Sequence, residues 1–310
     1  MQKAVVLKST GSWYEILDEN THQILKARLR GKIKLKELKV TNPIAVGDIV
    51  AWEWEKNTAH QAIILDILPR ENYIMRSSTH KTAHGHILAA NIDGALLVAT
   101  LAFPRTSFGF IDRFLVTAES FRIPVCIVFN KIDLLTSEEE KEYLDEICHM
   151  YERIGYDTMR ISAINKDENL FPLQEYLKGK RTLIAGHSGV GKSTLINRLA
   201  PHVNQKTAEI STFNKGVHTT TFAEMFEIAP QTFLIDTPGI KEWGIIDMEP
   251  EEVGHYFPEF RARLNECKFH SCTHTHEPGC AIRLAVENGE IALTRYESYL
   301  SIFSGEDNRK

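Results

Sequence analysis

A glycine-rich loop in the middle of the chain carries the clearest chemistry. Residues 186–194 read GHSGVGKST and fit the pattern G-x-x-x-x-G-K-[ST]. Glycines let backbone N–H groups wrap phosphate oxygens without a clashing Cβ, and a lysine and a hydroxyl then serve the terminal phosphates and Mg²⁺. The predicted phosphate-binding residues are Gly186, His187, Ser188, Gly189, Val190, Gly191, Lys192, Ser193 and Thr194. A strand over 181–185 and a helix over 193–199 provide the context that this motif requires.

A second motif, N-K-x-D, predicts which base the nucleotide carries. Asn130, Lys131, Ile132 and Asp133 follow an apolar strand over 124–129, and ligands of open α/β sheets bind at strand ends. The Asp133 carboxylate can accept two hydrogen bonds from a guanine edge, a donor pair that adenine lacks. The motif therefore favours GTP over ATP and disfavours an ATP-using kinase or ATPase. Two residues after the next strand are expected to support the base, namely Ser162 and Ala163.

A third motif, D-x-P-G, begins at Asp236 after a strand over 232–235. Asp236 is expected to hold Mg²⁺ through water, and the N–H of Gly239 to sense the γ-phosphate and reset a switch. Either Thr219 or Thr220 completes the Mg²⁺ shell, and the sequence does not choose between them. Many GTPases carry a glutamine at the position of Ile240, so His218 is the candidate for orienting the attacking water.

The order of these motifs is rotated. In most GTPases the base-reading motif follows the phosphate loop, but here Asn130 and Ser162 precede Gly186. Domain termini often lie close together, so circular permutation can preserve such a site. As a consequence, the segment after Asp236 leads directly into residues 244–310. We expect nucleotide state to influence that C-terminal region.

A cysteine-rich window near the C-terminus predicts a metal site. Cys267, Cys272 and Cys280 lie close together in sequence, with His270, His274 and His276 as competing fourth ligands. Three thiolates and one imidazole make a closed tetrahedral zinc site, which is structural because catalysis requires an open position. The region is short, and a metal ion would compensate for its small core.

Composition and pattern divide the 310 residues into three zones. Residues 1–68 contain short β-like runs separated by turns, which favour a small barrel. Residues 69–243 alternate strands and helices, as in a parallel sheet covered by helices. Residues 244–310 contain helical segments over 281–287 and 291–303. The net charge of −5 means that nucleic-acid binding would need a local basic patch.

The N-terminal zone offers one such patch. Basic residues alternate along the chain and would share one face of a strand; they are Lys26, Arg28, Arg30, Lys32, Lys34 and Lys36. Trp52 and Trp54 also share a parity that would suit base stacking. The alternative is the solvated face of an antiparallel sheet with both tryptophans in the core. No apolar run approaches the ~18 residues of a membrane span, and the first residues lack signal-peptide order, so a cytoplasmic location is expected.

Taken together, these motifs resemble the small-ribosomal-subunit biogenesis GTPase family. The resemblance rests on the motif order, the phosphate loop, the cysteine cluster and three further stretches: AANIDGALLVAT (89–100), GVHTTT (216–221) and DTPGIKEWG (236–244). It implies three domains, namely an N-terminal OB-fold barrel, a central circularly permuted α/β GTPase domain and a small helical zinc domain. It selects His274 as the fourth zinc ligand.

The same resemblance implies a cellular role. The expected substrate is GTP with Mg²⁺, and the expected partners are the small ribosomal subunit and its rRNA, with subunit-stimulated hydrolysis during late maturation. A monomer without a membrane partner is expected. A competing interpretation is a nucleotide-gated RNA-binding module whose GTP turnover is incidental, because Ile240 cannot orient water by hydrogen bonding.

Overall fold

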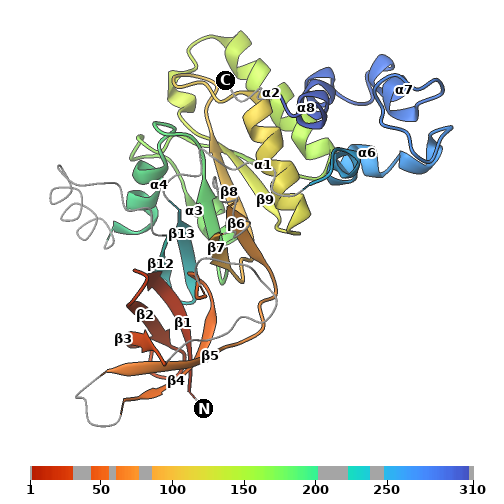
Figure 1. The fold of residues 1–310 in the computed structure, drawn as a ribbon. Helices are drawn as coiled ribbons and strands as arrows, with labels where there is room; N and C mark the ends of the chain where they lie inside the picture. The colour runs from red at the N-terminus through yellow and green to blue at the C-terminus, as the bar shows by residue number, and fades with distance from the viewer. Residues whose placement is uncertain are drawn as a thin grey trace. The chain divides into compact units, whose positions relative to one another are not determined.

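A computed structural model describes residues 2–30, 43–55, 61–76, 86–201, 223–237 and 248–306 (Figure 1). The chain forms two compact units. The first comprises residues 1–96, 169–185 and 192–242, and the second comprises residues 97–168, 186–191 and 243–310. Four predicted site residues lie outside the described residues: His218, Thr219, Thr220 and Gly239.

In the first unit, the N-terminal strands form a closed barrel. The strands are β1 (Gln2–Ser9), β2 (Tyr14–Asp18), β3 (Ile24–Leu29), β4 (Ile49–Trp54) and β5 (Ala62–Ile67). Pairing runs β1–β2–β3–β5–β4 and returns from β4 to β1, and only β3–β5 is parallel. Closure leaves the barrel no free edge, and a five-stranded closed barrel is the architecture of the OB-fold. The predicted small barrel is confirmed.

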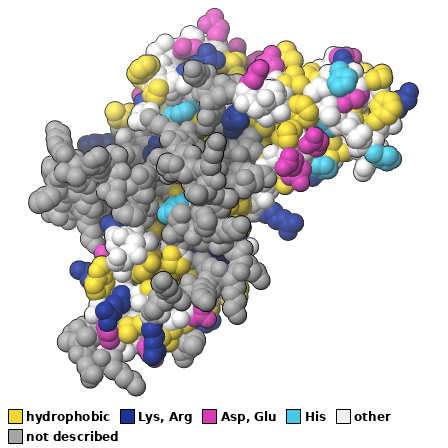
Figure 2. Space-filling model, viewed as in Figure 1, with side chains coloured by type: hydrophobic (Ala, Val, Ile, Leu, Met, Phe, Trp, Pro, Cys, Tyr) yellow, Lys and Arg dark blue, Asp and Glu magenta, His cyan; other side chains and the backbone are white. Residues whose placement is uncertain are grey.

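The alternation predicted along β3 is present. Leu25, Ala27 and Leu29 face inward, whereas the basic residues Lys26, Arg28 and Arg30 are exposed. Each basic side chain has a glutamate nearby. Arg28 and Arg30 form ion pairs with Glu55 and Glu53, and Lys26 lies across from Glu15 on β2. Lys, Arg, Asp and Glu side chains are accordingly intermixed on the barrel face shown in Figure 2. The remaining predicted basic residues, Lys32, Lys34 and Lys36, lie outside the described residues.

The two tryptophans of β4 differ in exposure. Trp52 is only 3% exposed and its Nε1 donates to Asp18 Oδ2 at 3.0 Å, so the idea that Trp52 stacks on bases is wrong. Trp54 is 45% exposed and packs edge-on against Trp52 at 5.0 Å between ring centroids. The shared parity misled because Trp54 stands at the end of the strand, beyond the closed core.

The remaining described residues of the first unit form a hairpin, further strands and two helices. The hairpin pairs β6 (Tyr73–Arg76) with β7 (His86–Ala90). The strand β13 (Thr232–Asp236) pairs in parallel with β11 (Arg181–Ala185) and antiparallel with β12 (Glu224–Ala229). The helices are α3 (Phe171–Leu177) and α4 (Lys192–Leu199).

The second unit contains parallel strands and long helices. The strand β9 (Val125–Phe129) lies between β8 (Gly94–Ala99) and β10 (Asp157–Arg160), and β9 and β8 are fully buried, as expected of a sheet covered on both faces. The helices are α1 (Phe108–Ser120) and α2 (Glu138–Arg153). Ser137 caps α2 in a reciprocal arrangement with Glu140, which fixes the start of this helix.

The C-terminal residues of the second unit form short helices. They are η3 (Pro250–Tyr256), α6 (Pro258–Arg261), η4 (Leu264–Glu266), α7 (Ala281–Glu287) and α8 (Leu293–Phe303). We call residues 250–303 the C-terminal region. Its core contains Phe257, Phe260, Ile282 and Tyr299, and it includes Val116 from α1. Predicted helices at 281–287 and 291–303 are present, the second beginning at Leu293. Among the described residues, no helix is long and apolar enough to span a membrane.

Candidate nucleotide site and metal centre

Asn130 connects three loops of the second unit. Its backbone N donates to Ala99 O at 2.8 Å at the end of β8. Its side-chain Nδ2 donates to Val190 O in the phosphate loop at 2.8 Å, and its Oδ1 accepts from Ala163 N at 2.9 Å. Asn130 is 4% exposed, so these bonds are shielded from water and rigidify the arrangement. The base-reading motif, the phosphate loop and the Ser162–Ala163 segment therefore lie together, as the sequence predicts.

Two positions of the phosphate loop require glycine for two reasons: a neighbouring atom leaves no room for a Cβ, and the backbone has a positive φ. Gly186 has φ +139°, and a Cβ there would lie 2.3 Å from Val98 O. Gly191 has φ +98°, and a Cβ there would lie 2.3 Å from Asn130 Nδ2. Any side chain at Gly191 would displace Asn130, so the loop and the base-reading motif constrain each other. Positive φ values of this kind are readily adopted only by glycine.

The residues that would contact the base remain accessible. Lys131 adopts a left-handed conformation with φ 63° at the start of η1 (Ile132–Leu134). Asp133 is exposed, and its Oδ1 accepts a hydrogen bond from the buried Ser162 hydroxyl. Because that bond fixes one carboxylate oxygen, the orientation of Asp133 is set before a ligand binds.

In the first unit, Asp236 is the last residue of β13 and pairs with Ile184 of β11. Ile184 precedes Gly186 by two residues in the chain. Burial raises the pKa of the Asp236 carboxyl, and the nearby Lys192 ammonium opposes that rise. Ser193 and Thr194, in the first turn of α4, are exposed. Their hydroxyls are thus accessible, as the predicted contacts to phosphate and Mg²⁺ require.

The structure also shows supports that the sequence analysis missed. Phe110, in the first turn of α1, lies against His187 of the phosphate loop with ring centroids 3.6 Å apart. Residues 100–106, between β8 and α1, contact both Lys131 and Gly189. No motif signals these residues, because their role depends on which loops the parallel strands bring together.

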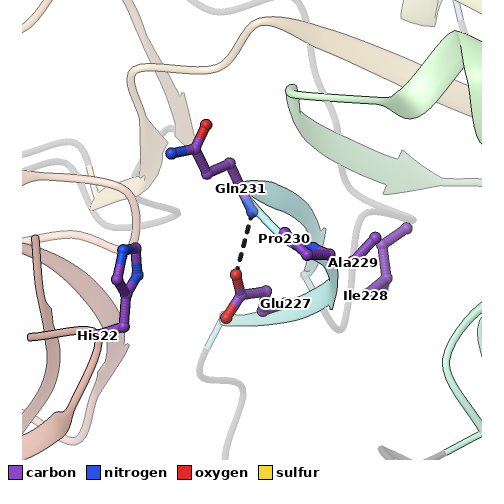
Figure 3. Close-up of a pocket in the computed structure, with 6 residues that line it drawn as sticks. All are labelled: His22, Glu227, Ile228, Ala229, Pro230 and Gln231. Carbon is purple, nitrogen blue, oxygen red and sulfur yellow. Dashed lines mark hydrogen bonds between the residues drawn. The ribbon is translucent and has the colours of Figure 1, made fainter.

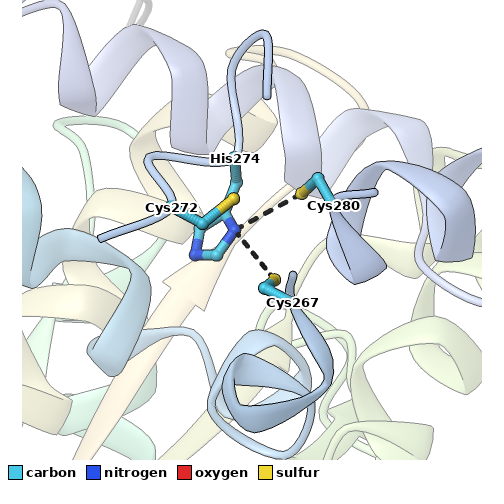
Figure 4. Close-up of side chains that lie close together, drawn as sticks. All are labelled: Cys267, Cys272, His274 and Cys280. Atoms are coloured by element: carbon cyan, nitrogen blue, oxygen red, sulfur yellow. Dashed lines mark hydrogen bonds between the residues drawn. The ribbon is translucent and has the colours of Figure 1, made fainter. Parts of the chain in front are cut away.

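The cysteine cluster has the geometry of a metal centre (Figure 4). The ligand atoms of Cys267, Cys272, His274 and Cys280 all lie within 4.8 Å of one another. His274 Nδ1 lies 3.6 Å from Cys267 Sγ and 3.5 Å from Cys280 Sγ. A tetrahedral zinc ion separates a sulfur and a nitrogen ligand by about 3.6 Å and two sulfurs by about 3.8 Å. The residues fit zinc, and His270 and His276 are not part of this group.

The surroundings of the cluster hold the ligand loop in place. Tyr296 donates to His274 O at 2.7 Å, and Tyr299 donates to Thr273 O at 2.6 Å. Burial raises the pKa of the Cys272 thiol to about 12 and lowers the pKa of His274. Zinc binds thiolates and neutral imidazole, so binding would release protons from the cysteines.

A buried ion network joins the C-terminal region to α1. Arg295 of α8 contacts Asp112 of α1 and Glu259 of α6, each at 2.7 Å. Asp112 also accepts from the Tyr151 hydroxyl of α2 at 2.9 Å. Burial by itself lowers the pKa of Arg295, but the two carboxylates reverse this to a net rise. The guanidinium therefore stays charged, and it couples helices that are far apart in sequence.

A separate hollow in the first unit lies between His22 and the β12–β13 turn, residues 227–231 (Figure 3). The Glu227 carboxylate accepts from the backbone N of Gln231 at 3.1 Å, which closes the turn. Ile228, Ala229 and Pro230 supply the other lining groups. The described residues around this hollow lack the convergent polar groups that fix a ligand.

Comparisons with known proteins agree with this architecture. Residues 67–246 match the RsgA GTPase family, and residues 3–64 match the RsgA N-terminal domain. The protein "Small ribosomal subunit biogenesis GTPase RsgA" of Bacteroides fragilis is 49% identical over 99% of this chain and 98% of its own length. Its namesake from Cytophaga hutchinsonii is 48% identical over 99% and 100%.

Solved structures give the same result over the whole chain. YjeQ from Thermotoga maritima is 34% identical with a TM-score of 0.77, covering 100% of this chain and 99% of its own. YloQ, described as a circularly permuted GTPase, is 28% identical with a TM-score of 0.76, covering 100% and 96%. With close relatives over nearly its full length and a family match over more than half of it, this chain belongs to the RsgA GTPase family.

Proposed function

We propose that this protein binds GTP through Asp133 and the 186–194 loop and hydrolyses it to GDP and phosphate. The observation that carries the proposal is the position of Asn130, which joins the base-reading motif to the phosphate loop and to Ala163. The two motifs are separated in sequence and in unusual order, yet they meet at one buried side chain. Preformed loops of this kind lower the entropic cost of ligand binding.

The metal roles are also proposals. Ser193 and Asp236, with Thr219 or Thr220, would hold Mg²⁺, which neutralises charge on the phosphates. Cys267, Cys272, His274 and Cys280 would hold one zinc ion that stabilises the C-terminal region. His218 is proposed to orient the attacking water. If the His218→Ala variant binds GTP normally and keeps its full stimulated rate, His218 has no such role.

The relatives are named for small-ribosomal-subunit biogenesis. We therefore propose that this protein acts in the cytoplasm as a monomer, binds the small subunit and its rRNA late in assembly, and is stimulated by the subunit. The discriminating measurement is steady-state GTP hydrolysis with and without purified small subunits. Large stimulation supports this function. Binding that depends on GTP but gives no stimulation would instead support a nucleotide-gated RNA-binding module.

Guanine recognition can be tested separately. An Asp133→Asn variant replaces an acceptor with an amide that can donate, so it should lose GTP affinity and gain affinity for xanthosine triphosphate. The exposed Asp167, four residues after Ala163, provides the control Asp167→Asn, for which nucleotide preference should not change. If Asp133→Asn retains full GTP affinity, Asp133 does not read the base.

A further inference from the structure

The loop between β8 and α1 supports the nucleotide site from one side. Lys131 Nζ donates to Phe103 O at 3.0 Å. The Pro104 ring lies against Gly189, with its Cγ 3.3 Å from the position that a Cβ would occupy. Residues 101–105 are therefore held at once by the base-reading motif and by the phosphate loop.

The same loop is closed by its own hydrogen bonds. Thr106 N donates to Thr100 O at 2.8 Å, and Thr100 N donates to Thr106 Oγ1 at 3.1 Å. The Thr100 hydroxyl donates to Pro104 O. Thr100 and Thr106 are buried, so the base of the loop is fixed. The side chains of residues 103–105 therefore project from a backbone of fixed conformation.

What the loop presents is an aromatic ring beside a guanidinium. Phe103 is 83% exposed, more than any other large apolar side chain in the described part of the chain. Arg105 is also exposed, whereas Leu101 and Ala102 are half-buried. The Phe103 carbonyl is thus engaged by Lys131 while its ring stands in water. An exposed ring on an ordered loop is available to a partner.

The surroundings of Phe103 favour RNA over protein as that partner. Protein interfaces bury an apolar core of several side chains, and Phe103 has no exposed apolar neighbour in its loop. A single ring suffices to stack on an unpaired base, and an adjacent arginine suits a phosphate. We propose that Phe103 and Arg105 form an RNA contact, Phe103 stacking on an unpaired base and Arg105 binding a phosphate. This inference rests on the proposed function, because that RNA would be the rRNA of the small subunit.

The test is binding of full-length variants to purified small subunits, together with GDP affinity. Stacking energies of this kind predict that Phe103→Ala weakens subunit binding by about fivefold or more. Phe103→Trp should restore binding and Phe103→Leu should not. Arg105→Ala should lower the salt dependence of log affinity by about one unit. GDP affinity should stay unchanged in all four, and Phe171→Ala, which removes another exposed ring on α3 (60% exposed), should bind subunits normally.

Other outcomes would overturn the inference. If Phe103→Leu binds as well as Phe103→Trp, the ring meets an apolar protein surface. If Phe103→Ala weakens GDP binding alone, the ring covers the nucleotide. If Phe103→Ala matches the wild type, the loop makes no contact. Failure of the wild-type protein to bind subunits would instead remove the proposed function itself, which separates the two ideas.

Discussion

The N-terminal barrel and the C-terminal region each bury an arginine against an aspartate, but to different ends. In the barrel unit, Arg70 contacts Asp48 at 2.6 Å, and the two residues flank neighbouring strands, β5 and β4. In the C-terminal region, Arg295 contacts Asp112, which lies in α1, 183 residues away. The first pair connects two segments of the same barrel unit. The second fastens short helices to a helix of the GTPase fold.

This difference follows from how much each region can bury by itself. The barrel closes every strand edge around a core of inward-facing residues such as Val6, Ile16 and Ile64. The C-terminal helices are short, and their core borrows Val116 from α1. Small cores of this kind rarely suffice without a metal ion or other cross-links. The comparison therefore predicts that the C-terminal region depends on its metal cluster and on Arg295, whereas the barrel does not.

Removal of the proposed zinc ion should have the largest effect. Structural zinc contributes on the order of 10 kcal/mol of folding free energy in small domains. Treatment with a strong chelator, or Cys280→Ser, should abolish hydrogen-exchange protection over 250–303 and leave β1 protected. His276→Ala, a change at an exposed histidine outside the cluster, is the control and should retain protection. Equal loss of protection in β1 would contradict the comparison.

Breaking the buried ion network should come next. Arg295→Met leaves Asp112 and Glu259 buried without their cation, and loss of one partner of such a pair typically costs about 3–5 kcal/mol. Urea unfolding followed by a probe in the C-terminal region should show this loss. The double variant Arg295→Met/Asp112→Leu should recover part of it. The partly exposed pair of Arg263 and Glu290 supplies the control Arg263→Met, which should change stability by less than about 1 kcal/mol.

Additive behaviour of the two substitutions at Arg295 and Asp112 would show that the contact does not couple α8 to α1. Hydrogen exchange gives a further test of this coupling. If the network is what fastens the C-terminal region to α1, exchange protection in α8 should fall in Arg295→Met even when zinc remains bound.

A smaller loss is expected at Asp18, a buried polar residue of the barrel. Burial alone would raise the pKa of Asp18, but hydrogen bonds from Thr21, Trp52 and Asn20 hold it below its ordinary value. A lowered pKa means that the contribution of Asp18 to stability is complete above the unfolded value of about 3.9 and is lost as pH falls through the folded value. Asp18→Asn should therefore cost about 1–3 kcal/mol at neutral pH and flatten the pH dependence of barrel unfolding below pH 4. A pH profile identical to wild type would exclude Asp18 as its source.

The features that could be predicted from the sequence follow the same division. Local patterns predicted the phosphate loop, the barrel and the cysteine cluster, because spacing within a few residues encodes them. Arg295, Asp112 and Phe103 escaped notice because their roles depend on contacts between elements far apart in the chain. Asp112 did leave a trace, as a carboxylate within the apolar run FIDRFLV. Trp52 and Trp54 share a parity, which places both side chains on one face of β4. Parity does not show that Trp52 lies within the closed core and Trp54 beyond it.

The smallest expected effect concerns the outer face of the barrel. Arg30 and Glu53 form a pair 3.1 Å apart, with side chains 67% and 49% exposed, and exposed pairs of this kind contribute about 0–1 kcal/mol. Arg30→Ala should therefore leave the urea midpoint of the barrel nearly unchanged, and raising salt should erase any difference. The affinity of Arg30→Ala for small ribosomal subunits tests whether this face of the barrel binds a partner. A change in binding without a change in stability would show that Arg30 contacts the partner and is not needed for the barrel to fold.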